Sequence, residues 1–256
     1  MSLLQTDHYS YSTLSGFSEC PYMIYLQKIE KIPLISNGFA EQGTLIHNLL
    51  DEWAKGKISA DKLPEEYEKR YSQYVVTQFP RMLSSKGYTE KTYQQGLEYF
   101  KNFDRFEGFE IVSAEEACET TIAGRPFVGF IDLILREKET GNIVICDHKS
   151  KSLSSFKKAE NEMYKQQLLY AKFVYEKYNV WPDTLMFNLF KENVRMTRPF
   201  SQTEYQDTLH WAEEQIRKIE SFDTLDWLET KEQDFFCTEI CSCRKECYNG
   251  VYVKKK

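Results

Sequence analysis

The spacing of apolar residues changes near residue 108 of the chain. Before this point apolar residues recur at helical spacing, as in Leu45, Leu49, Leu50 and Trp53. The pattern predicts helices over residues 14–29, 39–53, 65–79 and 89–106. The first hundred residues are therefore expected to be mainly helical.

Beyond residue 108 the spacing is typical of strands. Three segments rich in Val, Ile and Phe cover residues 110–121, 125–136 and 143–149. Turn residues separate them at Gly124-Arg125 and Thr140-Gly141-Asn142. This arrangement predicts an antiparallel meander of three strands.

The segments that follow alternate between helix and strand. We expect a helix over 160–178 and a strand pair over 184–190 and 194–200, around the turn Lys191-Glu192-Asn193. Ser201-Gln202-Thr203-Glu204 has the sequence of a capping box, which predicts a further helix. The order of elements predicts a mixed α/β (α+β) fold and not a doubly wound dinucleotide-binding fold.

Composition adds the class of protein. The chain has 256 residues, of which 41% are hydrophobic and 28% charged, and this suits one compact soluble domain. Its apolar runs are too short to span a bilayer, and its first residues lack the basic and apolar regions of a secretory signal. We therefore expect a cytoplasmic protein without membrane contact.

Charge is unevenly distributed along the chain. The formal net charge of −6 does not favour nucleic-acid binding, yet six lysines and only two acids lie between residues 149 and 172. The lysines are Lys149, Lys151, Lys157, Lys158, Lys165 and Lys172, and the acids are Glu160 and Glu162. By itself such a run is more often a solvated helix face than a binding surface.

Two acids interrupt strands that are otherwise apolar. Asp132 lies within Gly129–Leu135, and Asp147 and Lys149 follow the apolar residues 143–146. A carboxylate in such a strand is costly unless it is paired or binds a metal. Residues i and i+2 of a strand share a face, so Asp147 and Lys149 project together while His148 points away. Two carboxylates from neighbouring strands suit Mg²⁺ or Mn²⁺.

The acid-x-Lys triplet has little specificity alone, because Glu229-Thr230-Lys231 repeats it without an apolar strand before it. A structural salt bridge between Asp132 and Lys149 is the alternative interpretation of the pair.

Five motifs occur in an order that resembles one known family. They are 11–26, with Tyr11-Ser12-Thr13-Leu14 and Cys20-Pro21-Tyr22; Gly43-Thr44-Leu45-Ile46-His47; Gly129-Phe130-Ile131-Asp132; Asp147-His148-Lys149; and Gln166-Gln167-Leu168-Leu169-Tyr170. Together they resemble the PD-(D/E)XK nuclease superfamily. Within it they resemble the RecB-like branch, which includes the AddB nuclease domain and the CRISPR-associated RecB-like exonucleases.

This resemblance implies a fold and a division of the chain. It implies one nuclease domain over 1–256 with a restriction-endonuclease-like core sheet flanked by helices. A helical part, 1–107, would carry His47, and the catalytic core would span 108–221. A Cys-rich tail, 222–256, would pack back on the N-terminal helix.

The resemblance also implies residue roles. His47, Asp132 and Asp147 would be side-chain metal ligands, and the His148 backbone carbonyl would be a further ligand. Lys149 would orient the attacking water and stabilise charge on the phosphate. Gln166 and Tyr170, one helical turn apart, would position Lys149 and the DNA backbone. Asp51 and Glu119 are further acids that could approach the metal, although a solvated helix acid is the more frequent role for Asp51.

The seven cysteines fall into two groups. Cys118 and Cys146 lie in apolar strands and are expected to be inert core residues. The resemblance implies that four of the other five hold an iron–sulfur cluster, with one thiolate from the N-terminal region and three from the tail. These five are Cys20, Cys237, Cys241, Cys243 and Cys247. The tail has one cysteine more than that layout needs, and a structural Zn²⁺ site or unliganded thiols stay open as alternatives.

The leading functional hypothesis is a metal-dependent DNA exonuclease that acts on ends or single strands in recombination, replication or repair. The alternatives are an inactive nuclease-fold DNA-binding or scaffold protein and a structure-specific or restriction-type endonuclease. A chain without helicase motifs suits an accessory nuclease in the cytoplasm of a bacterium or of a virus-infected host cell. It would act with a separate helicase or recombination protein.

Overall fold

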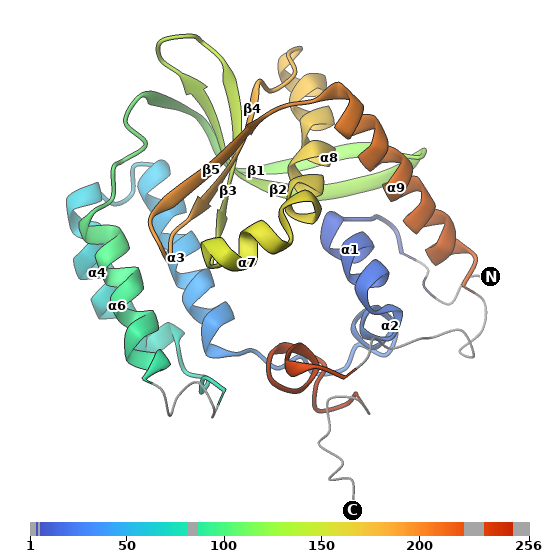
Figure 1. Ribbon diagram of the computed structural model, residues 1–256, viewed down its shortest axis with the longest axis horizontal. Helices are drawn as coiled ribbons and strands as arrows, with labels where there is room; N and C mark the ends of the chain where they lie inside the picture. Colours follow the sequence, from blue (N-terminus) through green and yellow to red (C-terminus); the bar gives the residue numbers. More distant parts are fainter. Residues whose placement is uncertain (1–3, 5, 81–86, 223–232, 248–256) are drawn as a thin grey trace, which may run out of the picture. The chain divides into compact units, whose positions relative to one another are not determined.

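The computed structural model describes residues 4, 6–80, 87–222 and 233–247 (Figure 1). Within them one sheet has the strand order β1-β2-β3-β4-β5. The strands are β1 (Phe109–Ile122), β2 (Arg125–Glu137), β3 (Ile143–Lys149), β4 (Thr184–Leu189) and β5 (Val194–Pro199). β2 and β3 pair antiparallel, β3 and β4 parallel, and β4 and β5 antiparallel. The predicted mixed α/β fold is confirmed.

The turn between β1 and β2 is formed by Ala123 and Gly124, one residue earlier than predicted. Both residues have positive φ, 51° and 70°. Two consecutive positive φ values are typical of the tight hairpin turn whose twist matches that of the flanking strands.

Contacts between residues group the chain into two compact units. The first consists of Met1–Asn37, Thr120–Val128 and Gln206–Lys256, and the second of Gly38–Glu119 and Gly129–Tyr205. This grouping cuts across the three parts expected from the sequence, and the single nuclease domain stays a prediction. All predicted metal-ligating and catalytic residues lie in the second unit.

Three helices of the second unit, α3, α4 and α6, pack on one another. They span α3 Gly38–Ala54, α4 Leu63–Tyr74 and α6 Tyr88–Lys101, and a 3₁₀ turn, Ala60–Lys62, precedes α4. Leu45, Leu49 and Leu50 of α3 are buried against Tyr67 of α4 and Leu97 of α6. The predicted apolar stripe is therefore the contact surface of this helical layer.

Two of these helices are shorter than predicted. The helix expected to reach residue 79 ends at Tyr74, and the carboxylate of Glu41 accepts hydrogen bonds from the backbone N–H groups of Val76 and Thr77. The helix expected to reach residue 106 ends at Lys101, where Asn102 leaves the helical region with ψ 20°, and it cannot resume at Arg105 and Phe106, whose φ values are 56° and 52°. Neither value is compatible with a right-handed helix.

The parallel pairing of β3 with β4 requires a crossover, which α7 (Leu153–Lys158) and α8 (Glu160–Tyr178) provide. α8 has the predicted bounds, whereas the short α7 was not predicted. Tyr164 of α8 packs its ring 5.0 Å from that of Phe187 on β4. The opposite face of the sheet, with Cys146 and Met186, packs against Trp53 of α3. The sheet of this unit therefore lies between α8 and α3.

The first unit contains α1 (Tyr11–Glu19), α2 (Pro21–Lys28) and most of α9 (Gln202–Glu220). The single helix expected over 14–29 is wrong, because Cys20 is extended, with φ −155°, and Pro21 cannot donate a helical hydrogen bond. Ser201 Oγ accepts from the backbone N–H of Glu204 at the start of α9, as the capping box predicts.

A single π-helical turn, Phe236–Ile240, follows in the tail part of this unit. No helix among the described residues is long and apolar enough to cross a membrane.

Candidate active site

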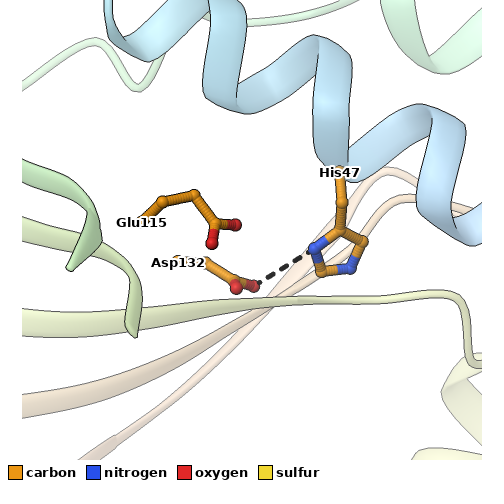
Figure 2. A group of neighbouring side chains, drawn as sticks. All are labelled: His47, Glu115 and Asp132. Carbon is orange, nitrogen blue, oxygen red and sulfur yellow. Dashed lines mark ion pairs between the residues drawn. The ribbon is translucent and has the colours of Figure 1, made fainter. Parts of the chain in front are cut away.

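Asp132 of β2 lies between two groups that interact with its carboxylate, the backbone N–H of His148 and the ring of His47. Its side chain is 13% exposed, and Oδ2 accepts a hydrogen bond from the backbone N–H of His148 at 2.6 Å. The same oxygen lies 3.5 Å from Nδ1 of His47, which α3 presents to the sheet (Figure 2). Asp132 therefore connects β2 and β3 to α3 of the helical layer.

Asp147 and Lys149 share one face of β3, as predicted. Lys149 Nζ lies 2.7 Å from Asp147 Oδ2 and donates a hydrogen bond to Gln166 Oε1 at 3.1 Å. Gln166 Nε2 in turn donates to the hydroxyl of Tyr170 at 3.4 Å. The Gln-x-x-x-Tyr pair of α8 thus holds the ammonium of Lys149 at one place beside Asp147.

His148 points to the other face and is buried. Its Nδ1 lies 2.9 Å from the amide nitrogen of Asn188, and that nitrogen also donates to the hydroxyl of Tyr99 at 2.7 Å. Burial lowers the pKa of His148 well below its usual value of 6.5. The imidazole is therefore neutral, and its anchoring fixes the peptide between Asp147 and Lys149.

Gly129 is required by the close approach of Tyr170. A Cβ atom built on Gly129 would lie 2.3 Å from the Tyr170 hydroxyl and 2.6 Å from its ring. The glycine of the Gly-x-x-Asp motif therefore lets the tyrosine of the Gln-x-x-x-Tyr motif rest on β2.

Three ligand atoms, from His47, Glu115 and Asp132, lie within 4.8 Å of one another (Figure 2). They come from α3, β1 and β2, so one donor from each of three elements converges. Glu115 has φ +51°, which is unusual for a non-glycine residue in a strand and often marks a functional position. Among the described residues this group is the one whose donor spacing suits a metal ion.

The protonation behaviour of this group also suits a cation. Burial and then the charge of Asp147 raise the pKa of Asp132 well above its usual range. Burial and then Asp51 raise the pKa of Glu115. Burial lowers the pKa of His47, which favours the neutral imidazole that ligates metals. A divalent cation would stabilise the ionised form of both carboxylates, which their burial disfavours.

The donor set fits a divalent metal ion. Two carboxylates and an imidazole are suitable ligands for Mn²⁺ and, with waters, for Mg²⁺. Asp147 Oδ2 is buried and, despite its ion pair, accepts no well-aligned hydrogen bond from a described residue. That oxygen has a free lone pair beside the His47, Glu115 and Asp132 group, to which it is electrostatically coupled.

A family model described as the PD-(D/E)XK nuclease superfamily matches residues 8–248. The chain belongs to this superfamily. The five-stranded sheet between helices is accordingly the restriction-endonuclease-like core of the superfamily.

The solved structures that are similar to the chain include one from Eubacterium rectale, described as a "Putative exonuclease". The two chains are 13% identical with a TM-score of 0.46, and the match covers 83% of this chain and 80% of that one. No curated protein matches the chain.

Glu115 is the residue that sequence reasoning missed in this nuclease. The strand acid proposed from sequence, Glu119, is exposed on β1, and Asp51 forms an i,i+4 ion pair with Lys55 at 2.6 Å. Glu115-Glu116 is a pair of adjacent acids, and regular alternation would direct them to opposite faces. Only the positive φ of Glu115 shows which carboxylate reaches His47. The comparison triplet at Glu229-Thr230-Lys231 lies outside the described residues.

The lysine run between 149 and 172 is partly neutralised. Lys165 pairs with Glu162 at 2.8 Å, and Lys172 pairs with Glu176 at 2.8 Å. The members that remain exposed lie at or near α7: Lys151, Lys157 and Lys158. Any contact with substrate phosphates from this run therefore rests on these three and on Lys149.

The tail cysteines of the nuclease lie against α2. Cys241 and Cys243 form a buried cluster with Leu26, and Cys247 packs beside them. A hydrogen bond from the thiol of Cys241 lowers the pKa of Cys243 to about 7. The other two candidates are also buried: Cys20, at the start of α2, and Cys237.

These thiols do not form a ready zinc site. A zinc ion with four thiolates at about 2.3 Å brings its sulfurs to about 4 Å of one another. Among the residues that the structure describes, no three cysteine sulfurs lie within 4.8 Å of one another. Cys118 and Cys146 are buried, and burial raises the pKa of Cys118 to about 12.

Proposed function

We propose that the chain is a divalent-metal-dependent DNA exonuclease that hydrolyses phosphodiester bonds in recombination, replication or repair. The observation that carries this proposal is the convergence of His47 and Asp132 with the Asp147–Lys149 pair. Each is of the residue type that the superfamily uses for catalysis, and Gln166 supports the lysine.

The ion would be held by His47, Asp132, Asp147 and the carbonyl of His148, with Glu115 as an additional carboxylate ligand. A bound divalent cation neutralises charge on the phosphate and lowers the pKa of a water. Asp132 and His47 bring the donor atoms together, and the pKa of His47, lowered by burial, keeps its imidazole neutral.

Lys149 acts on the reacting atoms. Its ammonium, held between Asp147 and Gln166, donates hydrogen bonds to the attacking water and to a phosphate oxygen. The charge that develops on the phosphate in the transition state is stabilised by this fixed positive group. Tyr170 acts through Gln166, which it holds toward the lysine.

DNA as substrate and cleavage from ends are supported by the resemblance of the five motifs to the RecB-like branch. The exposed lysines near α7 would bind backbone phosphates, and a separate helicase or recombination protein would supply unwound ends.

The test is cleavage of end-labelled linear DNA and of covalently closed circles with Mg²⁺ or Mn²⁺. We expect linear DNA alone to be degraded, and chelation to stop the reaction. Lys149→Ala should be inactive, while Lys69→Ala, which removes an exposed lysine of α4, should act like the wild type. Equal cutting of closed circles would favour the endonuclease, and cleavage of neither substrate would favour the inactive scaffold.

We further propose that four of Cys20, Cys237, Cys241, Cys243 and Cys247 hold an iron–sulfur cluster in the first unit. The burial of Cys241 and Cys243 against α2, and the position of Cys20 at its start, support this proposal. Anaerobically purified protein should be brown and absorb visible light. Colourless protein with one zinc per chain would contradict it.

A further inference from the structure

Phe130 is a large aromatic residue that the fold leaves in solvent beside the metal-binding group. It is 61% exposed, although it lies in the middle of β2 and only two residues before Asp132. Its ring makes no contact with another aromatic ring of the residues that the structure describes. A phenyl ring in this position gains little from burial in the folded chain.

The faces of β2 show where this ring points. Gly129 lies against Tyr170 of α8, and Ile131, which is 1% exposed, follows two residues later, so these two residues lie on the face of β2 that is turned toward α8. Phe130 and Asp132 alternate with them and share the other face. On that face the carboxylate of Asp132 meets His47 and Glu115 (Figure 2). The exposed ring and the metal-binding carboxylate are therefore presented to the same side of the strand.

The spacing suits a nucleic acid strand. Two residues of a β-strand cover about 7 Å. This is roughly two stacking steps of about 3.4 Å along a nucleic acid strand. A phosphate bound by a metal ion at Asp132 would thus bring one of the adjacent bases next to the Phe130 ring.

The surroundings of Phe130 suit a single planar ligand better than the apolar surface of another protein. The exposed positions of the neighbouring strand β1 carry small or polar side chains, namely Glu110, Ala117, Glu119 and Thr121. An isolated ring among polar groups is too small for a hydrophobic interface. It is sufficient for stacking on a base, which needs only one exposed aromatic face.

We propose that Phe130 is a base-stacking residue that holds a nucleotide next to the scissile phosphate. The proposal rests on the proposed nuclease function and specifies its substrate as an unpaired strand. Bases inside a duplex are stacked on both faces, whereas an unpaired base can turn a free face to the ring.

The test uses single-stranded oligonucleotides that each carry one abasic nucleotide, moved stepwise past a defined cleavage position. The wild type should lose about tenfold in kcat/KM when the abasic nucleotide is one of those next to the scissile bond. Phe130→Ala should lose the same factor on the intact strand and no more on the abasic one. Phe130→Trp should keep the wild-type profile, and Phe130→Leu should follow Phe130→Ala.

The matched control is Tyr175→Ala, which removes another exposed aromatic side chain, 42% exposed, about 13 Å further along α8 than Gln166. It should keep the wild-type abasic profile. The same position-dependent loss in Phe130→Ala as in the wild type would overturn the stacking role, while the nuclease function would stand.

A binding measurement separates the two proposals. An oligonucleotide with 2-aminopurine at the sensitive position should lose fluorescence on binding to the wild type in Ca²⁺, and should not do so with Phe130→Ala. If the wild type cleaves no nucleic acid, the proposed function fails and this quenching still tests the stacking. Equal quenching by both proteins would overturn it.

Discussion

The metal-binding group of the second unit and the cysteine cluster of the first are assembled in opposite ways. His47, Glu115 and Asp132 are far apart in the chain and meet within 4.8 Å. Cys241 and Cys243 are close in the chain, yet no third described cysteine sulfur joins them at that spacing. Proximity along the sequence is therefore a poor guide to which donors form a compact site.

The two regions also differ in how burial acts on their ionisable groups. In the metal-binding group burial raises the pKa of Asp132, so the carboxylate form is disfavoured until a cation is present. In the cysteine cluster a hydrogen bond from Cys241 outweighs burial and lowers the pKa of Cys243 to about 7. The metal-binding group needs a cation to stabilise its carboxylates, whereas the lowered pKa of Cys243 favours its thiolate without one. The two regions should therefore respond differently to mutation, metal and pH.

The largest expected difference is in catalysis. Lys149→Ala should reduce kcat about a thousandfold, because the charged donor to the water and phosphate is lost. Cys243→Ser should reduce kcat much less, since no step of the reaction uses the thiol. Steady-state kinetics on linear DNA measures both. A loss in Cys243→Ser as large as that in Lys149→Ala would make the cluster part of the catalytic machinery and break the comparison.

A smaller effect is expected on metal affinity. Glu115→Gln should weaken Mn²⁺ binding about tenfold, because one of the two charged oxygen donors of the group becomes neutral. Glu119→Gln is the matched control, since this acid is exposed on the same strand, and its affinity should equal that of the wild type. Isothermal titration calorimetry gives both constants. Equal affinities in the two variants would remove Glu115 from the ligand set.

The pH dependence of metal binding follows from Asp132. Its folded-state pKa is raised, so without metal the protonated carboxyl is stabilised, and folding stability falls as pH rises from about 4 through the folded pKa. Mg²⁺ binds the ionised form, so the increase in Tm that it causes should be larger at pH 8 than at pH 5.5. Scanning fluorimetry measures it. In Asp132→Asn most of this pH dependence should vanish, and an unchanged slope would assign it to another group.

The smallest expected effect is on stability. Gly129→Ala places a methyl group 2.3 Å from the Tyr170 hydroxyl and should lower the free energy of unfolding by about 1–3 kcal/mol. Gly56→Ala has a positive φ but no atom within 4 Å, so it reports backbone strain alone. Urea denaturation compares the two variants. If Gly129→Ala retains wild-type stability and activity, the close approach of Tyr170 is not a constraint.

Much of the fold was predictable because its elements are locally consistent. α8 has the expected bounds, and the apolar stripe of α3 forms the expected contact surface. The break at Cys20 was also readable, since Pro21 allows a helix to begin but not to continue. The helix ends at Tyr74 and Lys101 were not, because they depend on a carboxylate from α3 and on left-handed residues.

The metal-binding group was predictable only where a motif marked it. Asp132 and Asp147 are anomalous in apolar strands, and His47 follows from the order of motifs. Glu115 has no such signal, because a positive φ determines which of two adjacent acids reaches the group.

The pairing of Lys165 with Glu162 follows helical spacing and could have been predicted from the sequence.

The anchoring of His148 by Asn188 has a practical consequence for spectroscopy. Because burial holds the pKa of this ring well below 6.5 and Asn188 occupies its Nδ1, the ring stays in one tautomer between pH 5 and 8. The signals of its imidazole should therefore show no protonation step of their own over a titration that moves those of solvent-exposed histidines. The ring of His148 lies only 5.6 Å from that of His47. A shift of its signals on addition of metal can therefore be assigned to the metal and not to protonation of the His148 ring itself.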